Sequence, residues 1–132
     1  MLFGTCGLLV LLYVFNLDRS SPNRSNEKLK EVWNLASTLP VFPGFTEVGS
    51  NVKSGYTVVD VTKHYASTAN FHDVKEFYAT LLNKDGWILV NGDAGMENSE
   101  VTFKRGQFSI SIFNTNTSSV YNYAIDFVWR YQ

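Results

Sequence analysis

The sequence predicts an α+β fold: an antiparallel β-sheet of about six strands with two helices packed on one face, preceded by one N-terminal transmembrane helix. Three observations support this. Residues 2–17 carry no charge and are almost wholly apolar, and two later segments repeat apolar residues at helical spacing. Several short segments between turn residues alternate apolar and polar side chains, and runs of strands with short turns are typical of antiparallel sheets.

The composition suits one folded domain. Of 132 residues, 45% are hydrophobic and only 17% are charged, so the chain can bury enough apolar surface to offset its loss of conformational entropy. We expect an N-terminal transmembrane anchor or uncleaved signal at 1–17, a polar linker at 18–26 and a single α+β domain at 27–132. A net charge of −1 with scattered basic residues argues against nucleic-acid binding.

The opening "MLFGTCGLLVLLYVFNL" fits a transmembrane anchor best. A helix over 2–17 would reach roughly 24 Å, slightly less than the ~30 Å hydrocarbon core. A cleavable signal peptide would carry a basic n-region and small residues at its cleavage site, and this stretch has neither. A lipoprotein signal would place its apolar run before Cys6, and a buried helix would find no place in so small a domain. The lack of basic residues before the apolar run could also mean that the given start lies downstream of the true translation start.

Two signals disagree on which side of the membrane the domain faces. Arg19, Arg24, Lys28 and Lys30 all follow the apolar run, which by the positive-inside rule places the domain in the cytoplasm. The segment "FNTNTSSVYNY" has the Asn, Thr, Ser and Tyr content common in exported domains. We favour the extracytoplasmic side. Cys6, the one cysteine, does not constrain the redox compartment.

The first helix of the domain is predicted after the linker, in which Pro22 interrupts any continuation of the anchor. Ser25 or Asn26 supplies the N-cap, and Pro40 ends the helix. One face is apolar, at Leu29, Val32, Trp33, Ala36 and Leu39. This face either packs on the sheet or lies along the membrane surface, with Lys28, Lys30 and Trp33 at the interface.

A stiff connector, "LPVFPGF", and a hairpin follow. We expect Phe42 and Phe45 to insert into the core. Strands are predicted at 46–51 and 55–67, joined by the loop "NVKSG". In the second strand, Val59, Val61 and Tyr65 share one face, and Asp60, Thr62 and His64 share the other.

The second helix is the clearest element of the sequence. Asn70 is its N-cap, Asp73 completes a near capping box, and Gly86 ends it. Its apolar stripe consists of Val74, Phe77, Tyr78, Leu81 and Leu82. Strands are then predicted at 87–91, 100–104, 107–114 and 120–131, with "KRGQ" as a tight hairpin.

The last predicted strand alternates aromatic and polar residues. One face carries Tyr121, Tyr123, Ile125, Phe127, Trp129 and Tyr131. We interpret this row as the inner face of the sheet, covered by the helix at 74–82. The alternative is an exposed aromatic platform for a peptide or glycan.

No motif in the chain predicts catalysis, a cofactor or a metal ion. His64 lies near Asp60 and Thr62, but no nucleophile accompanies it, and no Gly-x-Ser-x-Gly elbow surrounds Ser109 or Ser111. The segment "GDAGMENSE" lacks EF-hand spacing, and no glycine-rich phosphate loop is present.

Four segments together resemble an uncharacterised family of small bacterial α+β domains that are membrane-anchored or lipoprotein-like. They are "LPVFPGF", a strand ending in Tyr-Ala-Ser-Thr, "DVKEFYATLLNKDGW" and "VTFKRGQFSISIF", within residues 39–113. The matching residues are structural: a Pro-Gly turn (Pro43, Gly44), a Phe-Tyr pair (Phe77, Tyr78) and a Gly-Trp helix stop (Gly86, Trp87). The resemblance implies this fold and an extracytoplasmic setting, and brings no catalytic residues with it. The front of this chain departs from the family in lacking a lipobox.

The sequence therefore predicts a membrane-anchored, non-enzymatic binding or assembly module with a possible protein partner at the membrane. The possible binding surface comprises Asp60, Thr62, His64, Tyr121 and Tyr123. Strand addition at a sheet edge is one way to bind. The alternative is a small enzyme or ligand carrier with a pocket between the helix at 71–85 and the sheet, with Asp60, His64 and Tyr65 as first residues to suspect.

Overall fold

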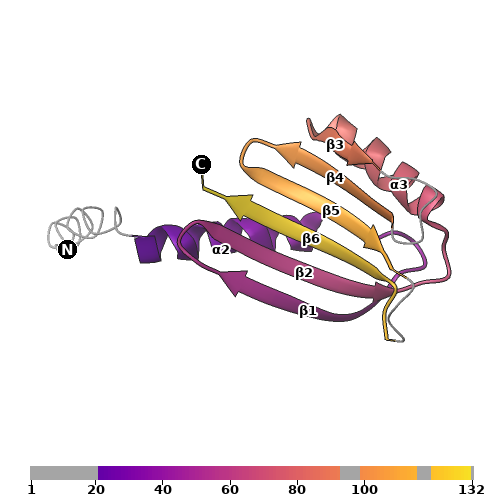
Figure 1. The fold of residues 1–132 in the computed structure, drawn as a ribbon, viewed down its shortest axis with the longest axis horizontal. Coiled ribbons are helices and arrows are strands. Elements are labelled where there is room, and N and C mark those ends of the chain that lie inside the picture. Colours follow the sequence, from indigo (N-terminus) through magenta and orange to yellow (C-terminus); the bar gives the residue numbers. More distant parts are fainter. Residues whose placement is uncertain (1–20, 93–98, 116–119, 132) are drawn as a thin grey trace, which may run out of the picture.

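The computed structural model describes residues 21–92, 99–115 and 120–131, and in them six strands form one antiparallel sheet with two helices (Figure 1). The helices are α2 (Ser21–Thr38) and α3 (Phe71–Lys84). The strands are β1 (Thr46–Ser54), β2 (Val58–Ala66), β3 (Ile88–Gly92), β4 (Ser99–Arg105), β5 (Phe108–Asn114) and β6 (Tyr123–Arg130). Their order across the sheet is β1-β2-β6-β5-β4-β3. The predicted α+β class is confirmed.

Both helices pack on the same face of the sheet (Figure 1). α2 lies over β2 and β6, whereas α3 lies over β3 and β4. Val32 of α2 and Val74 and Tyr78 of α3 are fully buried. Of the two positions left open for the first helix, packing on the sheet is the one found. The last strand is covered by α2, not by the helix at 74–82 as the sequence suggested, because β6 lies beside β2 under α2 while α3 packs on β3 and β4 at the far edge.

α2 begins earlier than the sequence predicts. Residues 21–26, expected as linker, are already helical. Pro22 lies in the first turn, where its missing N–H has no intrahelical partner to lose. Ser25 is not the cap: it is buried, with its Oγ 2.8 Å from the Oγ of Ser54.

The inner face of the sheet forms the core. Tyr123, Ile125, Phe127 and Trp129 are buried, which confirms the predicted inner row over that part of β6. The strand starts at Tyr123 rather than 120, because Asn122 is bonded to Ser67, which follows the end of β2. Its side chain accepts from Ser67 N at 3.0 Å and donates to Ser67 O at 2.7 Å.

The ends of α3 are as predicted. Asn70 Oδ1 accepts a hydrogen bond from Asp73 N at 2.9 Å, and Asn70 Nδ2 donates to Asp73 Oδ2 at 3.1 Å. Gly86 follows the helix with φ +84°, a left-handed conformation that favours glycine. This stop turns the chain directly into buried Trp87 and then β3.

The connector between α2 and β1 is fastened to the core through Tyr78. The Tyr78 hydroxyl accepts from Phe42 N and donates to Pro40 O, both at 2.9 Å. The rings of Phe42 and Phe45 pack against the core, Phe42 edge-on to Phe77 at 5.3 Å between centroids. The predicted insertion of both phenylalanines is confirmed.

Several predictions fall on residues outside the described ranges. They are the anchor at 1–17, most of the loop "GDAGMENSE" and residues 116–119. The described ranges hold no helix with the length and hydropathy needed to span a membrane.

Candidate binding surfaces

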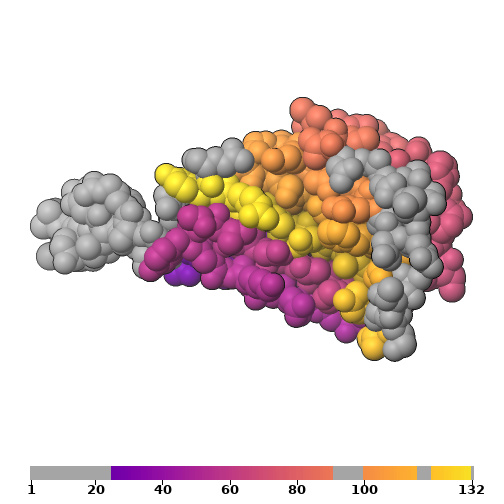
Figure 2. All heavy atoms as spheres, in the orientation of Figure 1, coloured from indigo at the N-terminus to yellow at the C-terminus, as the bar shows by residue number. Residues whose placement is uncertain are grey.

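The face of the sheet opposite the helices is not covered by either helix (Figure 2). Because β2 alternates, Asp60, Thr62 and His64 all project to this face, as predicted, while Val59, Val61 and Tyr65 are buried on the other. A polar row crosses the sheet through strand register. It runs Asn51, Thr62, Asp126, Ser111 and Thr102, on β1, β2, β6, β5 and β4.

A pair of carboxyl groups lies at the centre of this face. The Thr62 hydroxyl is 3.2 Å from Asp60 Oδ1 and 2.8 Å from Asp126 Oδ1, so it bridges the two side chains. Burial raises the pKa of Asp126 to about 7, and a hydrogen bond and like charge from Asp60 act in the same direction. The pair can therefore hold a proton near neutral pH. The described residues contain no cluster of metal-ligating side chains.

His64 and Tyr121 meet at one end of the same face. Their ring centroids are 4.2 Å apart, and the Asn51 amide nitrogen is 3.4 Å from His64 Nε2. His64 Nδ1 is buried and has no hydrogen-bond partner among the described residues. The sequence predicted both residues for the surface, although Tyr121 reaches it because it lies before β6 and outside its alternation.

Tyr123 does not belong to this surface. It is fully buried on the helix side, and its hydroxyl donates to Ala69 O at 2.7 Å. Burial raises the pKa of this tyrosine. The expected site therefore reduces to Asp60, Thr62, His64 and Tyr121, with Asp126 as the residue that sequence reasoning missed. Asp126 lies opposite Thr62 because β6 pairs with β2, and this pairing cannot be predicted from the local sequence.

The edge strand β3 exposes a continuous apolar surface that sequence reasoning did not single out. Ile88, Leu89 and Val90 are 66%, 46% and 52% exposed. Leu89 is opposite the buried Phe103 in the register, so it lies on the helix side, yet α3 leaves it half uncovered. β3 ends the sheet, and in the described part of the chain β4 is its one neighbour. In the sequence, this surface could have been recognised from the run Ile88, Leu89 and Val90, in which apolar residues do not alternate with polar ones.

The other edge strand, β1, has a different character. It carries the charged residues Glu47 and Lys53, and Glu47 pairs with Lys63 at 3.7 Å. Both edges contain a register irregularity, between Glu47 and Gly49 in β1 and between Leu89 and Asn91 in β3. The two edges therefore differ in charge: β1 carries charged side chains, whereas β3 carries none.

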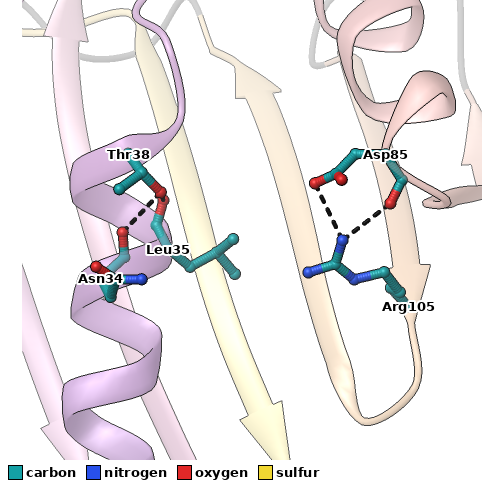
Figure 3. A network of polar contacts seen from close by, with 5 residues as sticks. All are labelled: Asn34, Leu35, Thr38, Asp85 and Arg105. Atoms are coloured by element: carbon teal, nitrogen blue, oxygen red, sulfur yellow. Dashed lines mark hydrogen bonds and ion pairs between the residues drawn. The ribbon is translucent and has the colours of Figure 1, made fainter.

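A cleft opens between the C-terminal halves of α2 and α3 (Figure 3). Its outer part, about 320 Å³, is flanked by Asn34 and Thr38 on one side and Asp85 and Arg105 on the other. An inner part of about 160 Å³ shares Leu35, Thr38 and Asp85 with the outer part and adds an apolar lining. That lining is Leu39, Pro40, Leu81, Leu82 and Trp87.

This cleft is not where the sequence placed a pocket. Directly between α3 and the sheet, Val74 and Tyr78 are buried in a continuous core, and Leu82, which is also buried, borders the inner part of the cleft. The helices instead separate sideways, because α2 follows β2 and β6 while α3 follows β3 and β4.

Comparisons of the chain with protein-family models, with curated proteins and with solved structures gave no match. The function is therefore argued from these surfaces.

Proposed function

We propose that this chain is a membrane-anchored, non-enzymatic binding or assembly module that docks an extended segment of a protein partner on the edge of β3. The observation that carries the proposal is the exposed, uncharged apolar run Ile88–Val90 on a strand that ends the sheet.

An extended peptide is the occupant that fits this edge. The outer side of an edge strand presents backbone N–H and C=O groups at the spacing of a β-ladder, which another strand satisfies. Exposed apolar side chains on both sides of β3 add burial to those hydrogen bonds. Such strand addition is a recurrent mode of peptide recognition, in which the backbone supplies affinity and side chains supply specificity.

The comparison of the two edges supports β3 over β1. Natural sheets commonly protect an edge with charged side chains, because these oppose pairing with another strand. β1 has Glu47 and Lys53, whereas the sequence of β3, ILVNG, has no charge. A sheet that protects one edge and leaves the other apolar is suited to one partner on one side.

The anchor and the side of the membrane complete the proposal. We expect residues 2–17 to hold the chain in the membrane and the domain to face outward. After carbonate extraction of cells that express the full chain with a C-terminal tag, the tag should be in the membrane pellet. Protease should cut it in intact cells. A tag protected until lysis would place the domain in the cytoplasm, as Arg19 and Arg24 indicate, and a tag in the supernatant would remove the anchor from the proposal.

Docking on β3 is tested by photo-crosslinking from the two edges. The full chain carries p-benzoyl-phenylalanine at position 88 on β3 or at position 52 on β1, and membranes are irradiated. We expect a crosslinked partner from position 88 and none from position 52. Val90→Lys should reduce the product about tenfold, because the charge must be desolvated when a strand adds to the edge.

Val52→Lys is the matched control, because Val52 is also an edge valine of similar exposure, 43% against 52% for Val90. It should leave the crosslink unchanged. Equal products from both edges, or a product insensitive to Val90→Lys, would contradict docking on β3. A product of twice the chain's mass would identify the occupant as a second copy instead of a separate partner.

A further inference from the structure

We infer that the cleft between α2 and α3 is a binding site for a single-chain amphiphile with a carboxylate head and a short apolar tail. This inference does not depend on the docking of a strand at β3, since no residue of the cleft belongs to that strand.

The inner part of the cleft fits the tail. Its lining is apolar except where Thr38 and Asp85 mark the boundary with the outer part. Its volume of about 160 Å³ is close to that of engineered apolar cavities of about 150 Å³, which bind benzene. A tail of about six carbons therefore fills it. Trp87, which is 2% exposed, forms part of this lining.

Arg105, at the mouth, fits the head. Its Nη1 donates to the main-chain oxygen of Asp85 at 2.9 Å and to Asp85 Oδ2 at 3.0 Å (Figure 3). Its guanidinium lies 4.6 Å from the centre of the Trp87 ring. These contacts fix the guanidinium in place. They use one of its nitrogens, and the other two have no hydrogen-bond partner among the described residues. A planar guanidinium that is fixed in place and has free N–H donors is suited to bind a carboxylate.

Neighbouring charges favour a singly charged head. Asp85 and Glu31 also line the outer part, and Glu31 is 3.4 Å from Lys28. Their carboxylates would repel a doubly charged phosphate more than a carboxylate. The exposed Asn34 amide at the rim is a further polar group available to the ligand. Trp87 Nε1 is buried and has no acceptor in the described part of the chain. The head is therefore assigned as a carboxylate.

The test is a titration of the full chain, held in lipid nanodiscs, with octanoate, octyl phosphate and octylammonium. The indole N–H signals of the three tryptophans are followed by NMR. Octanoate should shift the Trp87 signal and leave the Trp129 signal, whose Nε1 is 3.3 Å from Gln107 Oε1, in place. Octanoate should bind at least fivefold more tightly than either other probe, and hexanoate about tenfold more weakly than octanoate.

Two variants separate head from tail. Arg105→Gln should weaken octanoate at least fivefold, and Leu35→Phe, which fills the cleft between the two parts, should abolish the Trp87 shift. Arg130→Gln removes an exposed arginine outside the cleft and should leave the affinity for octanoate and the Trp87 shift unchanged. Octylammonium binding as tightly as octanoate, an Arg105→Gln variant that binds like the wild type, or a Trp87 signal that octanoate does not move would each overturn the inference.

Discussion

Replacing Tyr78 with phenylalanine is expected to lower the free energy of unfolding by about 1–3 kcal/mol. The Tyr78 ring is fully buried, and its hydroxyl satisfies two main-chain groups of the connector, Phe42 N and Pro40 O. Phenylalanine keeps the ring and removes both bonds. The two bonds are partly buried, and a typical intramolecular hydrogen bond contributes about 0.5–1.5 kcal/mol, so the loss of both costs about 1–3 kcal/mol.

The measurement is urea denaturation of the full chain followed by tryptophan fluorescence. Tyr56→Phe is the control, because the Tyr56 side chain is 61% exposed and its loss of a hydroxyl should change stability by less than 0.5 kcal/mol, as is usual at surface sites. If Tyr78→Phe were as stable as the control, water would have to replace the hydroxyl, and Tyr78 would not be what holds the connector on α3.

Local patterns in the sequence predicted most of the fold. In α3, the cap at Asn70, the apolar stripe and the stop at Gly86 all act within a few residues of one another, and the structure has them as predicted. The alternation of β2 likewise depends only on consecutive residues. The start of α2 was predicted too late, because proline is equally compatible with a break and with a first helical turn.

The binding surfaces depend on distant parts of the chain, and there the sequence was less informative. Asp126 becomes part of the carboxyl pair because β6 lies beside β2, a register between residues far apart in sequence. Tyr121 and Tyr123 have the parity of one strand face, yet the bonds of Asn122 to Ser67 place the start of β6 between them. The cleft exists because the two helices follow different strands, which no local pattern specifies.

The carboxyl pair predicts that the chain becomes less stable as pH rises from about 4 to about 7. The ordinary pKa of an aspartate is 3.8, and in the folded chain burial and Asp60 raise the pKa of Asp126 to about 7. The folded state therefore holds a proton that the unfolded state releases. Its contribution to stability is fully present below about pH 4 and is lost as pH rises to about 7 and above.

The difference in stability between low and high pH is expected to be about 1–2 kcal/mol. A pKa of about 7 against 3.8 would give roughly 4 kcal/mol at most, but the Asp126 side chain is only partly buried, and solvent screening reduces the effect. The bond from Thr62 and the charge of Arg130 also favour the ionised form and act in the opposite direction.

Asp126→Asn should remove most of this loss and raise stability at pH 8 by about 1–2 kcal/mol, because an amide beside Asp60 carries no like charge and can donate to it. The measurement is urea denaturation of the full chain at pH 5 and at pH 8. Asp85→Asn, a change at an exposed carboxyl outside the pair, should not produce the gain. A variant less stable than the wild type at pH 8 would mean that Asp126 is ionised and stabilising there, with Thr62 and Arg130 outweighing burial and Asp60.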